Sequence, residues 1–190
     1  MIAIHCLGIV AGIFIIFCRF QDDQITNDFL TGLNNRNALE SYLVDRIKDY
    51  HDGQHGTRIL YLILLDINNF KRINDIYGHV EGDKALKCLA QALKRIGGKH
   101  RQTLFISRFG GDEFALIYET SSKANVESLC KEIKDTIKAE TEGWKYWITV
   151  SAGYTEYTGR DMSMDRFFTL ADNALYTDKR RMEGHITGGT

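Results

Sequence analysis

An unbroken apolar run that ends in a carboxylate constrains the fold more than any other feature of this chain. The run is Ile59–Leu65, and Asp66 follows it directly. A continuous apolar run of this length is typical of a β-strand buried on both faces. A carboxylate at the end of such a strand is costly unless it is paired or binds a cation. The sequence therefore predicts a central strand that ends at a polar site.

The remaining segments alternate between helical and strand-like patterns. Leu39, Leu43 and Ile47 recur at four-residue spacing, which predicts a helix. Two strand-like segments flank Gly110 and Gly111, a combination typical of a β-hairpin. By the same criteria we predict helices over 35–50, 69–76, 82–96, 126–137 and 167–176, and strands over 59–65, 104–108, 113–118 and 144–153. Helices mixed with a hairpin-containing sheet favour an α+β fold over a purely parallel doubly wound sheet.

Composition and charge restrict the class of protein. The chain has 190 residues, 44% of them hydrophobic, which suits one domain with a substantial core. The net charge is −1 and the basic residues are scattered, so we expect no nucleic-acid partner. The four cysteines form no Cys-x-x-Cys pair and no metal-ligand spacing, which favours reduced thiols in a cytosolic domain.

The N-terminal segment differs in kind from the rest. Residues 1–18 are apolar apart from His5, and Arg19 follows them. A helix over this stretch would be about 27–30 Å long, enough to cross the hydrocarbon core of a membrane. Because Lys and Arg favour the cytoplasmic side, we expect the inner membrane, with the remainder of the chain in the cytoplasm. We predict a membrane anchor over 1–20, a linker over 21–27 and a folded domain over 28–190. The alternatives are a buried N-terminal helix or the tail of a longer membrane protein.

The predicted hairpin carries further acidic residues. Residues 108–114 read RFGGDEF, so Gly110 and Gly111 come directly before Asp112 and Glu113. The glycines predict a tight turn with positive φ that lets a phosphate approach the backbone. Carboxylates are the hard oxygen ligands that Mg²⁺ uses when it holds a nucleoside triphosphate.

The hairpin gains meaning if it lies beside the central strand. Asp66, Asp112 and Glu113 would then converge from two neighbouring strands, as in sites for metal-assisted phosphoryl transfer. The competing interpretation is that Asp66 caps the next helix and Asp112 is an ordinary turn residue. The three acids taken together favour a site for Mg²⁺ or Mn²⁺.

Longer motifs make a family resemblance specific. Residues 66–83 read DINNFKRINDIYGHVEGD, residues 28–36 read DFLTGLNNR and residues 171–176 read ADNALY. With the hairpin, they resemble the GGDEF family of diguanylate cyclases, in that family's order, from Asp28 to about Lys179. The resemblance implies a nucleotidyl-cyclase or palm-like domain, with a central, mostly antiparallel sheet flanked by helices and the GGDEF turn on a hairpin. It also implies that two GTP are condensed into cyclic di-GMP and two pyrophosphates.

The resemblance assigns roles to individual residues. The implied ligands of Mg²⁺ or Mn²⁺ are Asp66, the backbone carbonyl of Ile67, Asp112 and Glu113, and Asp112 is also placed as the general base for the ribose 3′-hydroxyl. The implied substrate-binding residues are Asn74 and Asp83 for guanine, His79 beside them, Phe70, Lys71, Gly110 and Gly111 through their backbones, and Lys179 as a phosphate-neutralising lysine. An acid at position 83 suits guanine, because adenine lacks the N1–H and N2–H donors. Cap or turn roles for Asn74, His79 and Asp83 are the alternatives.

Three departures from the family pattern carry expectations of their own. Asn68 replaces the second Asp of a D-x-D run; the resemblance implies that this residue supports the loop and does not bind Mg²⁺ directly, so we expect a modest effect. Arg101 stands at the start of the inhibitory R-x-x-D motif, but Leu104 replaces its Asp, so this site is degenerate and product feedback should be weak or absent. After Lys179 the chain departs from the usual K-x-x-G-R-N ending, and Glu183 falls where a phosphate-binding Arg is usual. We expect weaker GTP binding; the alternative is that Arg180 or Arg181 substitutes for this Arg.

The resemblance also bears on assembly. Each domain of this family holds one GTP, so catalysis implies a homodimer. The N-terminal hydrophobic helix is one way to hold two copies together in the membrane. The alternative function is a weakly active or inactive GGDEF-like module that binds GTP or cyclic di-GMP. The intact set of Asp66, Asp112 and Glu113 favours the enzyme.

Overall fold

The computed structural model describes residues 26–54 and 56–187. The predicted membrane anchor over 1–20 and most of the predicted linker lie outside the described residues. Within the part of the chain that is described, no helix is both long and apolar enough to cross a bilayer.

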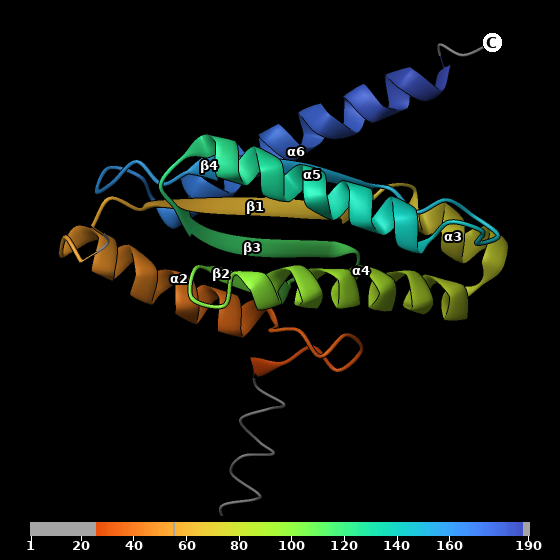
Figure 1. Cartoon of the computed structure of the whole chain (residues 1–190), viewed down its shortest axis with the longest axis horizontal. Helices are drawn as coiled ribbons and strands as arrows, with labels where there is room; N and C mark the ends of the chain where they lie inside the picture. The colour runs from red at the N-terminus through yellow and green to blue at the C-terminus, as the bar shows by residue number, and fades with distance from the viewer. Residues whose placement is uncertain (1–25, 55, 188–190) are drawn as a thin grey trace, which may run out of the picture.

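A single four-stranded antiparallel sheet forms the centre of the domain (Figure 1). Its strands are β1 Ile59–Ile67, β2 Leu104–Arg108, β3 Glu113–Thr120 and β4 Val150–Glu156, in the order β2-β3-β1-β4. The apolar run explains the inner position of β1, because the strand is buried from Leu60 onwards and needs cover on both faces. All three strand pairs are antiparallel, so the predicted α+β fold is confirmed.

Helices cover both faces of this sheet (Figure 1). They are α2 Arg36–His51, α3 Phe70–Tyr77, α4 His79–Lys99, α5 Lys123–Glu140 and α6 Met164–Thr187. Successive side chains of a strand point to opposite faces. Leu62 of β1 accordingly packs in one core with α2 and α6, whereas Ile63 packs in the other core with α4 and α5. The last turns of α6 project beyond the sheet in Figure 1.

Most of the predicted elements are confirmed, but several bounds differ. Helix α4 begins at His79 rather than Gly82, because Gly78 at φ 86° ends α3 and starts α4 directly. Gly97 and Gly98 lie inside α4 and do not end it. Helix α6 is much longer than the predicted segment 167–176.

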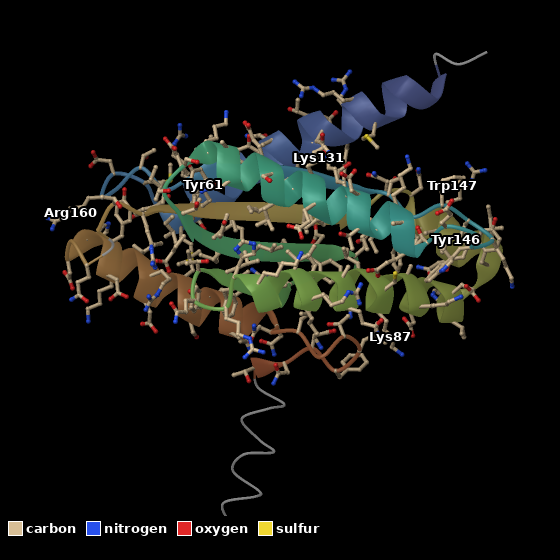
Figure 2. The ribbon with its side chains drawn as sticks, viewed as in Figure 1. Tyr61, Lys87, Lys131, Tyr146, Trp147 and Arg160 are labelled. Carbon is tan, nitrogen blue, oxygen red and sulfur yellow. The ribbon has the colours of Figure 1, made fainter. Side chains whose placement is uncertain are left out.

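Strand β4 begins at Val150 rather than at Trp144. The aromatic residues before it serve packing instead: the rings of Trp144 and Tyr146 meet edge to face with centroids 5.8 Å apart. The hydroxyl of Tyr146 also donates a hydrogen bond to the backbone carbonyl of Glu81 at 3.0 Å. Figure 2 shows Tyr146 and Trp147 at the end of the molecule where α3 lies.

Candidate active site

The ends of β1 and β3 bring two acidic residues together. Asp66 is the cross-strand partner of Glu113, and directly opposite residues of an antiparallel pair point to the same side of the sheet. Burial raises the pKa of Asp66, and the neighbouring carboxylate of Asp112 raises it further. Burial also raises the pKa of Glu113, followed by the carboxylates of Asp112 and Asp66. Because like charges directly opposite each other destabilise a sheet, this pairing is one that a cation would relieve.

The hairpin turn uses Gly110 for close approach and not for positive φ. Neither Gly110 nor Gly111 has a positive φ, so that prediction was wrong. A Cβ on Gly110 would lie 2.2 Å from Oε2 of Glu113, whereas a Cβ on Gly111 would meet nothing within 4 Å. The Glu113 carboxylate therefore folds back over the Gly110 backbone, and the missing side chain leaves room for it.

A lysine from the C-terminal helix contacts the buried acid. Nζ of Lys179 on α6 lies 2.8 Å from Oδ2 of Asp66. Asp66 is only 7% exposed, and Lys179 is half-buried. The pKa of Asp66 is still raised, because its burial outweighs the hydrogen bond and the charge of this lysine. The structure thus brings Lys179 to the acidic residues, where its partner is a carboxylate; its predicted contact with phosphate stays a prediction.

The donors predicted for Mg²⁺ or Mn²⁺ are partly assembled. Ile67 follows Asp66 at the end of β1, and Asp112 lies in the turn immediately before Glu113. Among the residues described, no three His, Cys, Asp or Glu side chains lie close enough to hold a metal ion unaided. Mg²⁺ commonly takes one or two protein carboxylates and completes its shell with substrate phosphates and water. Crowded carboxylate oxygens fit that requirement, and the individual ligand roles stay predictions.

Helix α3 starts from a left-handed residue. Asn69 has φ 57° and ψ 29°, and its side chain makes no capping hydrogen bond to the helix. The first N–H groups of a helix, here those of Phe70 and Lys71, have no acceptor within the helix. They are suited to an anion, in line with their predicted contact with phosphate.

The side chain of Asn68 is hydrogen-bonded to the residues at the start of β4. Its amide nitrogen donates to Oγ1 of Thr149 at 3.0 Å, and its amide oxygen accepts from Oγ of Ser151 at 2.7 Å. Both polar atoms of the side chain therefore support the segment that enters β4. This arrangement agrees with the expectation that Asn68 supports the loop.

The predicted guanine readers lie where α3 meets α4. A Cβ on Gly82 would lie 2.0 Å from Oδ1 of Asn74, so the Asn74 side chain lies directly against the first turn of α4. His79 and Asp83 are exposed on the same turn. Asp83 lines a pocket of about 640 Å³ between α4 and the end of α5, and Asn74 does not line that pocket. The structure places the predicted readers near one another but does not join Asn74 and Asp83 in this pocket.

Arg101 and Leu104 line a separate pocket of about 370 Å³ beside the end of α4. Leu104 is 9% exposed and belongs to the core that α4 and α5 cover. Its apolar side chain offers no hydrogen-bond acceptor next to Arg101. The geometry is consistent with the expectation that this motif is degenerate.

Sequence reasoning missed a polar network behind the hairpin. Nη1 of Arg108 lies 3.0 Å from both carboxylate oxygens of Asp28, and its Nη2 donates to the carbonyl of Gly111 at 2.6 Å. Thr31 donates to Asp28 from its backbone N–H at 2.9 Å and from its hydroxyl at 2.6 Å. Asp28 and Arg108 stood in recognised motifs, but no local pattern pairs two residues that lie 80 positions apart.

Comparison with known proteins gives a consistent picture. A family model described as "Diguanylate cyclase, GGDEF domain" matches residues 25–185. The chain is 39% identical to diguanylate cyclase DgcP of Pseudomonas aeruginosa over 164 residues, which is 84% of this chain and 23% of DgcP. It is 32% identical to diguanylate cyclase DgcN of Escherichia coli, over 82% of this chain and 37% of DgcN. The chain therefore spans well under half the length of these two relatives.

Solved structures agree with the sequence relatives. The coiled coil and GGDEF domain of DgcB from Caulobacter crescentus, crystallised with c-di-GMP, superimposes with a TM-score of 0.78 at 27% identity, and the match covers 93% of each chain. The isolated GGDEF domain of the same protein, also crystallised with c-di-GMP, gives a TM-score of 0.73 at 31% identity over 82% of this chain and 90% of that one.

Proposed function

This chain belongs to the GGDEF family of diguanylate cyclase domains, and from that membership we propose that it condenses two GTP into cyclic di-GMP with release of two pyrophosphates. The observation that carries the proposal is the pairing of Asp66 with Glu113 across β1 and β3, with Lys179 2.8 Å from Asp66. Crowded carboxylates beside one lysine form a site that a cation and a polyphosphate complete together.

The reacting group is the ribose 3′-hydroxyl of one GTP. Asp112 accepts its proton as the oxygen attacks the α-phosphate of the other GTP, and the bond from that phosphorus to pyrophosphate breaks. Asp66, the carbonyl of Ile67, Asp112 and Glu113 would hold Mg²⁺ or Mn²⁺. When bound, such an ion neutralises the triphosphate and lowers the pKa of the attacking hydroxyl.

Other residues bind and orient the nucleotide. Lys179 is half-buried, so it has room to exchange the Asp66 carboxylate for a phosphate oxygen. The N–H groups of Phe70 and Lys71 supply further donors to phosphate at the start of α3. Asn74 and Asp83 would read guanine, with His79 beside them. The exposed position of Asp83 leaves its carboxylate open to the N1–H and N2–H donors of that base.

Catalysis in this scheme needs two copies of the domain. Each active site holds one GTP, and both new bonds join one nucleotide to the other, so two sites must face each other. A homodimer is therefore part of the proposal.

The test uses the full chain fused to a dimerising leucine zipper, with GTP and Mg²⁺, and separates the products by chromatography. We expect cyclic di-GMP and pyrophosphate from the parent protein, and a loss of at least about a hundredfold in Asp112→Ala at an unchanged melting temperature. Asp135→Ala is the matched control, because the Asp135 side chain is 63% exposed on α5. Undiminished product from Asp112→Ala would overturn the mechanism. GTP binding without product in a folded dimer would indicate a binding module.

Product feedback gives a second readout. Leu104 is buried and apolar beside Arg101, so we expect cyclic di-GMP to inhibit weakly or not at all. Initial rates measured over a range of added product check this, and submicromolar inhibition would contradict it.

A further inference from the structure

A carboxylate on α6 joins three elements next to the lysine of the site. Oδ2 of Asp178 accepts a hydrogen bond from the backbone N–H of Ala152 on β4 at 2.9 Å. The same oxygen lies 2.6 Å from Nζ of Lys134 on α5. Helices α6 and α5 belong to the two cores on opposite faces of the sheet. Asp178 therefore bridges the two helical layers across the edge of the sheet.

The hydrogen bond from Ala152 falls close to the acidic residues. Strand β4 lies at the edge of the sheet, so it has N–H groups that no neighbouring strand accepts. Ala152 pairs with Leu65 of β1, and the preceding residue, Ser151, pairs with Asp66. Asp178 thus anchors α6 one residue away from Ser151, which is the partner of Asp66 on β4.

Helix α6 is also held against β4 by direct backbone packing. A Cβ on Gly153 would lie 2.0 Å from the backbone nitrogen of Leu175 and 2.5 Å from the carbonyl oxygen of Ala171. The helix backbone therefore touches the strand backbone at this point, one turn before Asp178. Beyond it, Asp178 makes the polar contact that fixes the next turn of the helix.

We propose that Asp178 is a positioning residue, which acts through Lys179 by fixing the turn of α6 that presents this lysine to Asp66 and to the triphosphate. Adjacent helical residues project about 100° apart. Asp178 can therefore grip the sheet edge and α5 while Lys179 reaches the end of β1, 2.8 Å from Asp66. This inference rests on the proposed function, because it assigns Lys179 to the bound substrate.

The binding test compares Asp178→Ala in two backgrounds, using the full chain. The probe is 3′-deoxy-GTP with Mg²⁺, which cannot react because it lacks the attacking hydroxyl, and binding is measured by calorimetry. We expect Asp178→Ala to raise Kd about five- to tenfold in the parent and less than about twofold when Lys179→Ala is already present. An equal loss in both backgrounds would mark Asp178 as merely structural, and no loss in the parent would also overturn the proposal.

Two further variants test the hydrogen-bonding role of Asp178 and the specificity of its effect. Asp178→Asn keeps an oxygen for the Ala152 N–H and should recover most of the affinity. Asp135→Ala is the control and should leave Kd unchanged, because Asp135 pairs with its exposed neighbour Lys131 on α5, at 2.5 Å. If Asp178→Asn raises Kd as much as Asp178→Ala does, the hydrogen bond from Ala152 does not position α6.

A measurement without nucleotide keeps the inference separate from the proposed activity. Acetylation of Lys179 by acetic anhydride, followed by mass spectrometry, reports how firmly Asp66 holds the lysine. We expect Lys179 to react at least about twofold faster in Asp178→Ala than in the parent and at the parental rate in Asp135→Ala. A parent that binds no 3′-deoxy-GTP would count against the proposed function. Equal acetylation rates in the parent and in Asp178→Ala would overturn the positioning role, whether or not nucleotide binds.

Discussion

Two carboxylates of this domain each face one cationic side chain, yet their environments shift their pKa values in opposite directions. Asp28 lies behind the hairpin against Arg108, and Asp66 lies in front of it against Lys179. Burial acts to raise the pKa of Asp28, but the hydrogen bonds from Thr31 and Arg108 together outweigh it and lower this pKa. Burial raises the pKa of Asp66, and the single lysine does not offset it.

The difference lies in how many donors each carboxylate has. Asp28 accepts two hydrogen bonds from Thr31 and a bifurcated, charge-assisted contact from Nη1 of Arg108, which leaves its charge satisfied within the protein. Asp66 has one lysine and acidic neighbours, so its negative charge is left in excess at the end of a buried strand. A satisfied carboxylate stabilises the fold, whereas an under-satisfied one is available to a ligand.

The largest effect should come from removing the under-satisfied charge. We expect Asp66→Asn to lower the rate of pyrophosphate release by about two to three orders of magnitude, because a metal ion at such a site contributes several kcal/mol to the transition state. Its free energy of unfolding should not fall, since the ionised carboxylate is unfavourable where it is and Lys179 is partly solvated. Parallel rate and denaturant measurements check both statements, and a large loss of stability would erase the contrast with Asp28.

Removing the charge of Asp28 should lower stability more than activity, the reverse of Asp66→Asn. Asp28→Asn leaves Arg108 without its charged partner, and the side chains of Asp28 and Arg108 are only 15% and 11% exposed. We expect the free energy of unfolding to fall by about 2 kcal/mol, because breaking a partly buried pair leaves the other charge uncompensated, between the costs for exposed and fully buried pairs. Urea unfolding of the full chain measures this change. A cost below about 0.5 kcal/mol, as for an exposed pair, would show that the network does not anchor the turn.

The same pair predicts a dependence on pH. A carboxylate whose folded pKa is lowered stabilises the fold above its unfolded pKa, and this stabilisation is lost as the pH falls through the folded value. The ordinary pKa of Asp is 3.8, so the parent should keep its advantage over Asp28→Asn above about pH 4 and lose it progressively below. Unfolding of both proteins between pH 7 and pH 2.5 tests this, and a gap that widens on acidification would contradict it.

The smallest predicted effect lies in the turn that connects the two environments. Gly110→Ala would place a Cβ 2.2 Å from the Glu113 carboxylate, which is the movable end of a side chain. We expect turnover to fall about tenfold as Glu113 moves away from Asp66, with a stability loss below about 1 kcal/mol. Gly98→Ala on α4 is the control, because a Cβ there also meets nothing within 4 Å. Equal rates for the two variants would refute the packing role of Gly110.

Local patterns in the sequence predicted the elements of this fold well. The apolar run of β1, the periodic helices and the hairpin each depend on neighbouring residues, and all are found. The conformation of the hairpin glycines was predicted wrongly, because composition does not distinguish positive φ from close approach. The start of β4 was misplaced because Trp144 and Tyr146, which resemble strand residues, pack on each other instead, and Tyr146 donates a hydrogen bond to Glu81.

The network behind the site could not be predicted, because its partners are distant in sequence. Asp28 and Arg108 are separated by 80 positions, and Lys134 and Asp178 by 44. No local pattern pairs such residues; only the completed sheet brings them together. The acids of the site were within reach of sequence reasoning because each ends or begins a recognisable strand.

Arg108 connects the β2–β3 hairpin to the first residues of the domain. Besides its bonds to Asp28 and Gly111, its backbone N–H donates to the carbonyl of Asn34 at 2.8 Å, and the Asn34 amide donates to the carbonyl of Ile106 at 2.8 Å. The turn at Asp28 and the hairpin are therefore held together by several hydrogen bonds. A displacement of the chain at Asp28 would reach the carbonyl of Gly111 through Arg108. The segment through which the chain enters the domain is therefore coupled to the loop that carries the acidic residues.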